Sequence, residues 1–279
     1  MRGLEKRDRL VSMQTPRGSP DAILRPTRAA HTISVERVPP SQALAGFVDY
    51  HWYVGWRAAE PYRQQVVPQP RVHLAAEPMH GEARLLVHGL SREPFFRTLT
   101  GEGHTLGAAF HPGGFRPFLR RSVGSVAGSV VPAGELLGLD DRPVAEQILA
   151  TCDVPAMVAA LEGYLSALDP AADPVVEQVR ALVREAEEDR GLNRAEDLAE
   201  RASMSLRSLQ RLFTEYVGAG PKWVVTRFRI LDAAAAAHGG EPVQWAALAA
   251  DLGFTDQAHL TRAFTAVVGT PPATYRREA

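Results

Sequence analysis

Hydrophobic positions change their spacing along the chain, and the first pattern is one of strands. From Ile33 to about Phe115, short runs rich in Val, Phe, Tyr and Trp recur about every ten residues between prolines and glycines. Such spacing is typical of an antiparallel sheet or a small barrel. We predict strands in these runs: ISVERV, FVDYHWYVGW, RQQVVP, RVHLAA, ARLLVHGL and HTLGAAF.

After Phe115 the apolar spacing becomes helical. It predicts a short helix over 115–121 and longer helices over 144–151 and 155–168. The apolar residues of the last helix recur at i, i+4 and i+8, which marks one face that we interpret as a lid or a dimer face. Prolines at positions 170 and 174 then disfavour helix in the residues before them, so we place a domain boundary there.

The C-terminal hundred residues contain an internal repeat. The segment 197–204 aligns with 247–254 at an offset of 50, and the residues that follow align at an offset of 51. The extra residue falls between a short helix and a longer one, where a turn tolerates insertion. Two short helices joined by a tight turn form a helix-turn-helix unit, so we predict two such units in tandem. The matching pairs at an offset of 51 are Leu209 and Leu260, Arg211 and Arg262, Phe213 and Phe264, Gly218 and Gly269, and Pro221 and Pro272.

The second helix of each unit has one apolar face and one polar face. Leu209 and Phe213 in the first unit, and their counterparts in the second, stand four residues apart and face the core. The opposite faces carry Arg, Gln, Thr and Ala, which can contact guanine, adenine and the thymine methyl group in the major groove. We therefore predict that these residues bind DNA: Arg207, Gln210, Arg211 and Thr214 in the first unit, and Gln257, Ala258, Thr261 and Arg262 in the second.

Local charge supports this prediction although the whole chain is nearly neutral. The 279 residues include 31 Lys and Arg against 32 Asp and Glu. From 201 to 229, however, six basic residues face one acidic residue, a net charge of +5, whereas 254–279 has a net charge of +1. We expect the first unit to dominate electrostatic affinity for DNA. Between the units, apolar spacing predicts a helix of about 24 Å over 222–237, long enough to present both second helices to successive major grooves.

The second unit carries a family signature. Its Gly253-Phe254, Asp256-Gln257, His259-Leu260 and Thr270-Pro271-Pro272 segments, with Tyr275-Arg276, resemble the C-terminal signature of the AraC/XylS family of bacterial transcription regulators. The resemblance covers about residues 174–279. It implies sequence-specific binding of double-stranded DNA, with the base-reading positions on the residues named above, and no enzymatic activity.

The N-terminal part resembles, more loosely, the poorly characterised domain that precedes this module in some family members. The FVDYHWYV, VVPQP and GAAFHPGGF segments carry that resemblance. It implies a domain, cupin-like in some members, that senses a small molecule or forms a homodimer. RNA polymerase is a further candidate partner. We take Trp52, Trp56, His73 and His111 as candidate ligand-binding residues.

The fold class that follows is α+β, in three parts. Residues 1–30 carry seven basic and three acidic side chains with little apolar periodicity, and we expect a flexible basic tail. Residues 31–170 form a mainly β sensory or dimerisation domain with C-terminal helices. Residues 174–279 form an all-α DNA-binding domain with two helix-turn-helix units and a linker helix.

Two alternatives remain for the strand region. The alternation of Tyr50, Trp52, Val54 and Trp56 puts four side chains on one face, which we interpret first as core and second as a ligand cage. Five histidines with Glu77 and Glu82 could bind a metal only if the fold assembled them, because no close ligand spacing is present. We therefore predict no metal and no cofactor. The histidines are His51, His73, His88, His104 and His111.

Other features narrow the class of protein. The single cysteine, Cys152, excludes an intramolecular disulfide, and we expect it to be buried. No apolar run approaches the length of a membrane span, and the N-terminus lacks the apolar core of a signal peptide, so we expect a cytoplasmic protein. The rival hypotheses are a cupin-type metalloenzyme, or a sensor of a partner protein through 155–168, with the C-terminal units as a DNA anchor.

Overall fold

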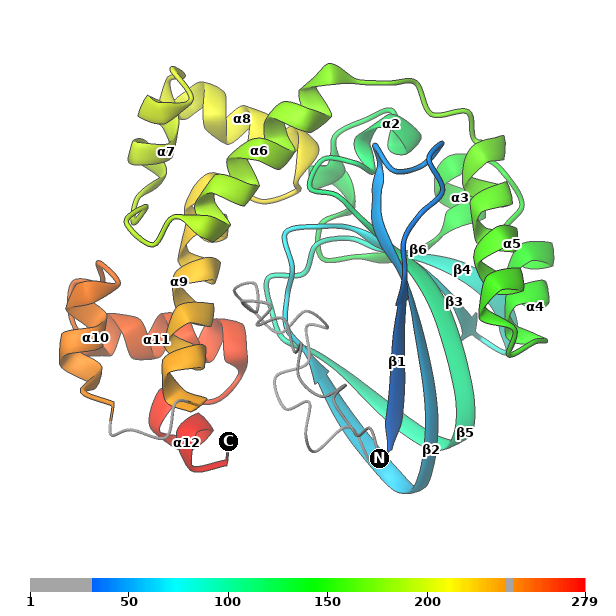
Figure 1. The fold of residues 1–279 in the computed structure, drawn as a ribbon, viewed down its shortest axis with the longest axis horizontal. Helices are drawn as coiled ribbons and strands as arrows, with labels where there is room; N and C mark the ends of the chain where they lie inside the picture. The colour runs from blue at the N-terminus through cyan, green and yellow to red at the C-terminus, as the bar shows by residue number, and fades with distance from the viewer. Residues whose placement is uncertain (1–31, 239–242, 279) are drawn as a thin grey trace, which may run out of the picture.

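The computed structural model describes residues 32–238 and 243–278. The predicted basic tail, 1–30, lies outside the described residues. A sheet occupies the N-terminal half of the described chain and helices occupy the C-terminal half (Figure 1). This arrangement confirms the predicted α+β class, with a mainly antiparallel N-terminal sheet followed by a helical domain.

All pairings in the six-stranded sheet are antiparallel, in the order β1-β2-β5-β3-β4-β6. One prediction was wrong: the separate runs FVDYHWYVGW and RQQVVP belong to a single strand, β2, whose register with β5 shifts between Val48 and Tyr50 and again between Ala58 and Tyr62. The second shift lets the strand continue through Pro61, which would otherwise break a ladder. The strands are β1 (Ile33–Val38), β2 (Val48–Val66), β3 (His73–Met79), β4 (Glu82–His88), β5 (Phe95–Phe110) and β6 (Val130–Pro132).

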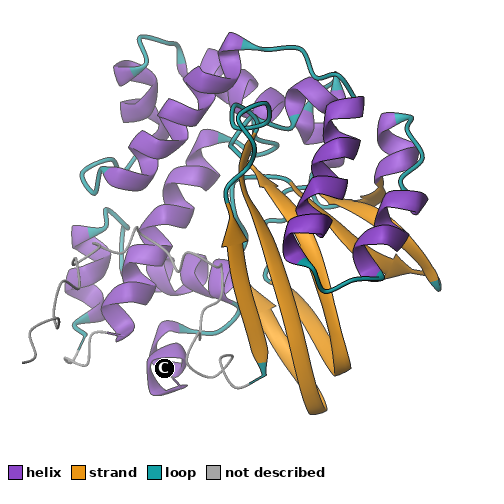
Figure 2. Ribbon diagram, turned by 45° about the vertical axis from the view of Figure 1, so that its right-hand side comes forward, coloured by secondary structure: helices purple, strands orange, loops and turns teal. Residues whose placement is uncertain are grey.

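Short helices cover one face of this sheet (Figures 1 and 2). The apolar face of α5, predicted as a lid or dimer face, is buried: Met157, Leu161 and Leu165 are fully covered in the main N-terminal core. The elements of this layer are α2 (Arg116–Leu119), the 3-10 helix η1 (Val123–Val126), α3 (Ala133–Leu137), α4 (Arg142–Leu149) and α5 (Val154–Ala167).

A buried carboxylate joins this helical layer to the sheet. Asp141, fully buried before α4, accepts hydrogen bonds from Arg84 Nε at 3.0 Å and Arg84 Nη2 at 2.9 Å. It also accepts from the backbone N–H groups of Leu85 at 2.7 Å and Gly134 at 2.9 Å. Because one carboxylate accepts from Arg84 and Leu85 on β4 and from Gly134 in α3, Asp141 fixes α3 and the start of α4 on β4.

The C-terminal domain has its own hydrophobic core. Its helices pack around α9, which runs through the middle of the domain in Figure 1. The linker helix predicted over 222–237 is α9, and a final helix, α12, was not predicted. The helices are α6 (Pro174–Glu188), α7 (Ala195–Arg201), α8 (Leu206–Tyr216), α9 (Pro221–His238), α10 (Trp245–Asp251), α11 (Gln257–Val268) and α12 (Pro272–Glu278).

Candidate nucleic-acid interface and ligand cavity

The two predicted helix-turn-helix units, α7–α8 and α10–α11, share one turn. The turn passes through a left-handed residue in each unit, Ser203 at φ 52° and Gly253 at φ 66°. The next residue then donates its N–H to the carbonyl oxygen five residues earlier, at 2.9 Å in the first unit and 2.8 Å in the second. The two units therefore have the same turn even though serine replaces glycine in the first.

The predicted reading face of α8 is open to solvent. Leu209 and Phe213 are completely buried, and the Ser205 hydroxyl caps the helix by accepting from the N–H of Ser208 at 3.1 Å. The cap fixes where the helix begins and so which residues lie on its first two turns. The four predicted DNA-binding side chains of this helix are all exposed: Arg207, Gln210, Arg211 and Thr214.

The second unit repeats this arrangement on α11. Leu260 and Phe264 are completely buried, and Asp256 caps the helix by accepting from the N–H of His259 at 2.7 Å. The predicted DNA-binding residues lie on the opposite face, where Gln257, Ala258 and Arg262 are exposed and Thr261 is half-buried. The two predicted reading faces are thus on the surface in both units.

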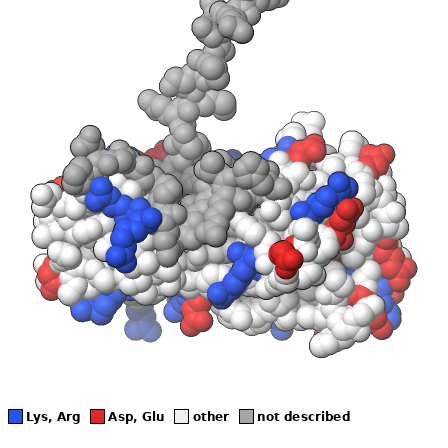
Figure 3. Space-filling view, turned by 90° about the horizontal axis from the view of Figure 1, so that it is seen from below, with Lys and Arg blue, Asp and Glu red and all other residues white. Residues whose placement is uncertain are grey.

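The sequence count of +5 overstates the charge available at the surface. Arg227 and Arg229, which contribute two of the six basic residues, are 5% and 9% exposed. Arg229 Nη1 donates to the Asn193 carbonyl at 3.1 Å, and its guanidinium lies 3.9 Å from the centre of the Phe254 ring. In the view of Figure 3, basic side chains gather toward the left end, the side of the C-terminal domain in Figure 1, and acidic ones are more frequent toward the right.

The C-terminal end of α8 touches the N-terminal domain. Glu215 accepts from Arg116 Nε of α2 at 2.7 Å, and the Ser122 hydroxyl donates to the Thr214 carbonyl at 3.3 Å. Of the residues predicted to contact DNA, Thr214 is therefore the one that borders the other domain. The first two turns of α8 make no such contact among the described residues.

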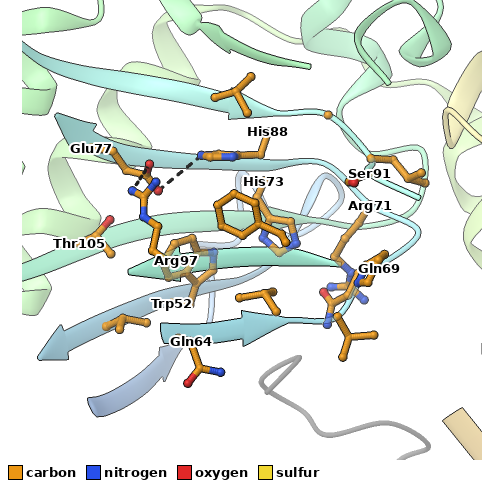
Figure 4. Close-up of a pocket in the computed structure, with 18 of the residues that line it drawn as sticks. Trp52, Gln64, Gln69, Arg71, His73, Glu77, His88, Ser91, Arg97 and Thr105 are labelled. Carbon is orange, nitrogen blue, oxygen red and sulfur yellow. Dashed lines mark ion pairs between the residues drawn. The ribbon is translucent and has the colours of Figure 1, made fainter. Parts of the chain in front are cut away.

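A cavity of about 330 Å³ lies on the face of the sheet opposite α4 and α5 (Figure 4). The side chains of Tyr50, Trp52, Val54 and Trp56 line it, while His51, between them on β2, is fully buried in the opposite direction. This face therefore lies outside the main N-terminal core and forms a cavity wall, although Val54 and Trp56 also pack against the small buried cluster of Ile33 and Leu99. Alternate residues of β2 point to opposite faces of the sheet, so one set lines the cavity and the other faces the buried core.

Glycines on the neighbouring strand make room for the two indoles. Trp52 pairs in register with Gly107 and Trp56 with Gly103, so the four-residue spacing on β2 matches that on β5. A Cβ atom would come within 2.5 Å of the Trp52 ring at Gly107 and 2.4 Å of the Trp56 ring at Gly103. Any larger residue at either position would displace an indole, which explains why glycine stands there.

Of the four candidate ligand-binding residues, three line this cavity: Trp52, Trp56 and His73. His111 lies outside its lining. It is buried at the end of β5, where its N–H donates to the Phe47 carbonyl at 2.8 Å and its Nδ1 lies 3.5 Å from Asp49 Oδ1. Burial lowers the pKa of His111 more than the Asp49 charge raises it.

An ion-pair cluster that sequence reasoning did not identify stands at one end of the cavity. Glu77 pairs with Arg97, and its Oε1 lies 3.5 Å from His88 Nε2 (Figure 4). Burial raises the pKa of Glu77, but hydrogen bonding and charge from His88 and Arg97 outweigh burial, so the pKa falls below its usual value. The nearest sequence signal was the alternation of β3, which puts His73 and Glu77 on the same face.

His73 lies in the middle of the cavity, where burial has the largest effect on its charge. Burial, followed by the charges of Arg71, His88 and Arg37, lowers the pKa of His73 to about 3. His73 is therefore neutral near pH 7 and can both donate and accept a hydrogen bond. The Arg71 guanidinium is held by Asp49, with Nη1 2.6 Å from Oδ2.

The edge of the cavity contacts the linker helix. Arg227 of α9 donates from Nε to the carbonyl of Pro68, a cavity-lining residue. Val67 and Leu90, which also line the cavity, are buried in the core of the C-terminal domain. Burial lowers the pKa of Arg227, an effect that the charge of Glu187 opposes.

Cys152 is exposed, with Sγ 3.8 Å from His104 Nδ1, so the expectation that it is buried was wrong. Among residues 32–238 and 243–278, no three His, Cys, Asp or Glu side chains gather closely enough to hold a metal ion. Nor does any helix in these ranges have the length and apolar character needed to cross a bilayer.

Comparison with known protein families finds one matching segment in each domain. Residues 36–132 match a domain of unknown function, DUF6597, and residues 198–278 match a helix-turn-helix domain. No curated protein sequence matches the chain.

Two solved structures of ToxT from Vibrio cholerae are similar at a low level. A 1.65 Å structure is 13% identical with a TM-score of 0.36, over 88% of this chain and 97% of that one. The wild-type protein of strain SCE256, bound to an unsaturated fatty acid, is 12% identical with a TM-score of 0.36, over 88% and 94%. Similarity at this level establishes neither a shared architecture nor a shared ligand.

Proposed function

We propose that this chain is a DNA-binding transcription regulator of the AraC/XylS family, which reads its operator through α8 and α11 under the control of a small molecule bound in the cavity of its N-terminal domain. We further propose the domain limits 31–170 and 174–279 for these two functions. The observation that carries the proposal is the duplicated unit, in which two capped helices with the same turn expose the same kinds of side chain.

The chemistry of these faces supports base reading. Arg211 and Arg262 occupy equivalent places on α8 and α11, and an arginine can donate two hydrogen bonds to one guanine. Gln210 and Gln257 can each pair with adenine in a similar bidentate way. Since the side chains are exposed and the helices begin at capped residues, the base-reading groups stand on rigid elements.

The linker helix supports simultaneous reading of two half-sites. Its 18 residues give α9 a length of about 27 Å. The helices α8 and α11 pack to the side of α9, which adds to the distance between them. The total suits two helices that enter successive major grooves, about 34 Å apart on one face of B-DNA. One copy of the chain can then read two half-sites without a partner.

Contacts between the domains support control by a ligand. Arg227 on α9 donates a hydrogen bond to the Pro68 carbonyl at the cavity edge, and Arg116 of α2 holds the end of α8 through Glu215. A ligand that binds one arrangement of these contacts better than another shifts the population of arrangements. The rival hypotheses, a metalloenzyme and a partner-protein sensor, find no comparable support in the part of the chain described here.

In vitro selection of DNA duplexes by the full-length protein, at two salt concentrations, tests the reading function. We expect enrichment of paired motifs about ten base pairs apart. Arg211→Ala should relax the base preference in one half-site and Arg262→Ala in the other, whereas Arg57→Ala, on the exposed surface of β2, should leave both intact. If no motif is enriched and moderate salt abolishes binding, the units are a non-specific anchor and the proposal fails.

A further inference from the structure

The walls of the cavity suit a flat ring. Two indoles lie on one face of β2, Trp52 over Gly107 and Trp56 over Gly103 of β5, and Phe95 and Tyr50 also line the space. Aromatic side chains pack well against other π systems and lose little freedom when they do so. A volume of about 330 Å³ is near the lower end of the range of ligand sites, roughly 300–1,000 Å³, which favours a compact ligand.

Several buried polar atoms on these walls have no hydrogen-bond partner among the described residues. Two are donors, Trp52 Nε1 and Arg71 Nε, and two belong to side-chain amides, Gln64 Oε1 and Gln69 Oε1. Gln64 is 9% exposed, so water has little access to it in this structure. Since buried polar groups in folded proteins are nearly always hydrogen-bonded, these atoms mark the places where a bound molecule completes the site.

The sign of the charge around the cavity distinguishes between ligands. The carboxylate of Glu77 is occupied by Arg97, whereas Arg71 keeps Nε free although Asp49 holds its Nη1. The cationic side chains Arg71 and Arg37 also act on His73, which lies between Trp52 and Arg71 in Figure 4. The region near Arg71 therefore disfavours a cation and favours an acceptor with negative charge.

We propose that the cavity binds a compact, planar aromatic compound bearing an anionic oxygen group, with its ring against Trp52 and Trp56 and its oxygen accepting from Arg71 Nε. The proposal deepens the proposed function, since it names the chemical class of the small molecule at the same site. An amide of Gln69 beside Arg71 can turn its NH₂ toward the same oxygen.

Isothermal titration calorimetry of the full-length protein with four probes tests the ligand class. The probes are 2-naphthoate, its uncharged amide, the cationic 2-naphthylmethylammonium, and octanoate as an aliphatic carboxylate. We expect 2-naphthoate to bind most tightly, the cation at least roughly tenfold more weakly, and the amide between them, since charge-assisted hydrogen bonds are the stronger ones. Equal or tighter binding of the cation overturns the anionic part, equal binding of octanoate overturns the aromatic part, and no binding of any probe overturns both.

Two conservative variants test the assigned atoms. Arg71→Lys keeps the positive charge but removes the Nε donor, and we expect 2-naphthoate to bind roughly 10- to 100-fold more weakly. Trp52→Phe keeps a ring but loses the indole N–H, and a loss of roughly 3- to 10-fold is expected. The matched controls, Arg57→Lys on the outer surface and Trp245→Phe on α10, should change the affinity less than twofold. Unchanged binding by Arg71→Lys refutes the placement of the oxygen group.

The readouts separate this proposal from the proposed function. Calorimetry requires no DNA, so binding of 2-naphthoate establishes the ligand class even if operator affinity does not respond to it. Operator affinity is then measured with and without the probe. Arg227→Met, which removes the donor to Pro68, should keep probe binding but lose any response of operator affinity. Failure of the probes to bind, together with intact operator binding, would overturn the ligand class while DNA reading stands.

Discussion

Ser203 and Gly253 occupy equivalent positions in the two turns and have the same left-handed backbone conformation. Each can therefore be replaced by the residue that the other turn carries. A non-glycine residue in that region costs about 1–2 kcal/mol. Glycine avoids this cost but loses about 0.5–1 kcal/mol more backbone entropy on folding. We therefore expect Ser203→Gly to raise the free energy of unfolding by up to about 1.5 kcal/mol, the largest difference between the two effects.

Gly253→Ser should destabilise the protein by more than Ser203→Gly stabilises it. A Cβ atom at Gly253 would stand 3.0 Å from Asn193 Cγ, so the neighbouring side chain must move as well. Gly253→Ser should lower the free energy of unfolding by about 1–2 kcal/mol. Urea denaturation of each full-length variant, monitored by circular dichroism, gives the midpoint of unfolding. If the slope of the transition is unchanged, the shift of the midpoint reports the change in the free energy of unfolding. Changes of the same sign in the two variants would refute the assignment of one turn geometry to both units.

Three other predictions concern charge. The pKa of His73 is lower in the folded protein than in the unfolded chain, so the unfolded state binds more protons and stability falls as the pH drops below about 6.5. His73→Phe should reduce this loss of stability by up to about 1.4 kcal/mol per pH unit. Urea denaturation at pH 6.5 and at pH 5 measures the difference. Asp141→Ala should cost about 3–5 kcal/mol of stability, since it leaves Arg84 without its buried partner, and a thermal shift of only one or two degrees would contradict this. Arg211→Ala should weaken specific operator binding by about 1–3 kcal/mol in gel-shift titrations, and an equal loss on unrelated DNA would make Arg211 a phosphate contact.

The helical repeat could be predicted because its signals are local. Buried Leu and Phe four residues apart define the core face of each second helix, and the offset between copies identifies the turn. Ser205 and Asp256 cap α8 and α11 by accepting a hydrogen bond from the N–H group three residues later. Residues that are neighbours in the sequence therefore determine where each helix begins. The exposed predicted reading faces follow from the same periodicity.

The cavity could not be predicted in this way because its walls come from several strands. Alternation shows that Trp52 and Trp56 share a face, but a core face and a cavity wall have the same pattern in one strand. What distinguishes them is the partner strand, where Gly103 and Gly107 leave space for the indoles. The pairing of β2 with β5 joins residues about fifty positions apart, and no periodicity within β2 contains that information.

The arginines of α9 show why residue type and location must be considered together. By composition Arg227 and Arg229 belong to a basic segment that suits DNA, yet both are buried and donate to backbone carbonyls. Arg227 bonds the edge of the cavity, while Arg229 bonds the loop before α7 and covers the Phe254 ring of the second unit. One helix is thus bonded to the ligand cavity and to both reading units. A movement at Pro68 that displaced α9 would change the relation of the two units to each other, and two half-sites of fixed spacing are sensitive to that relation.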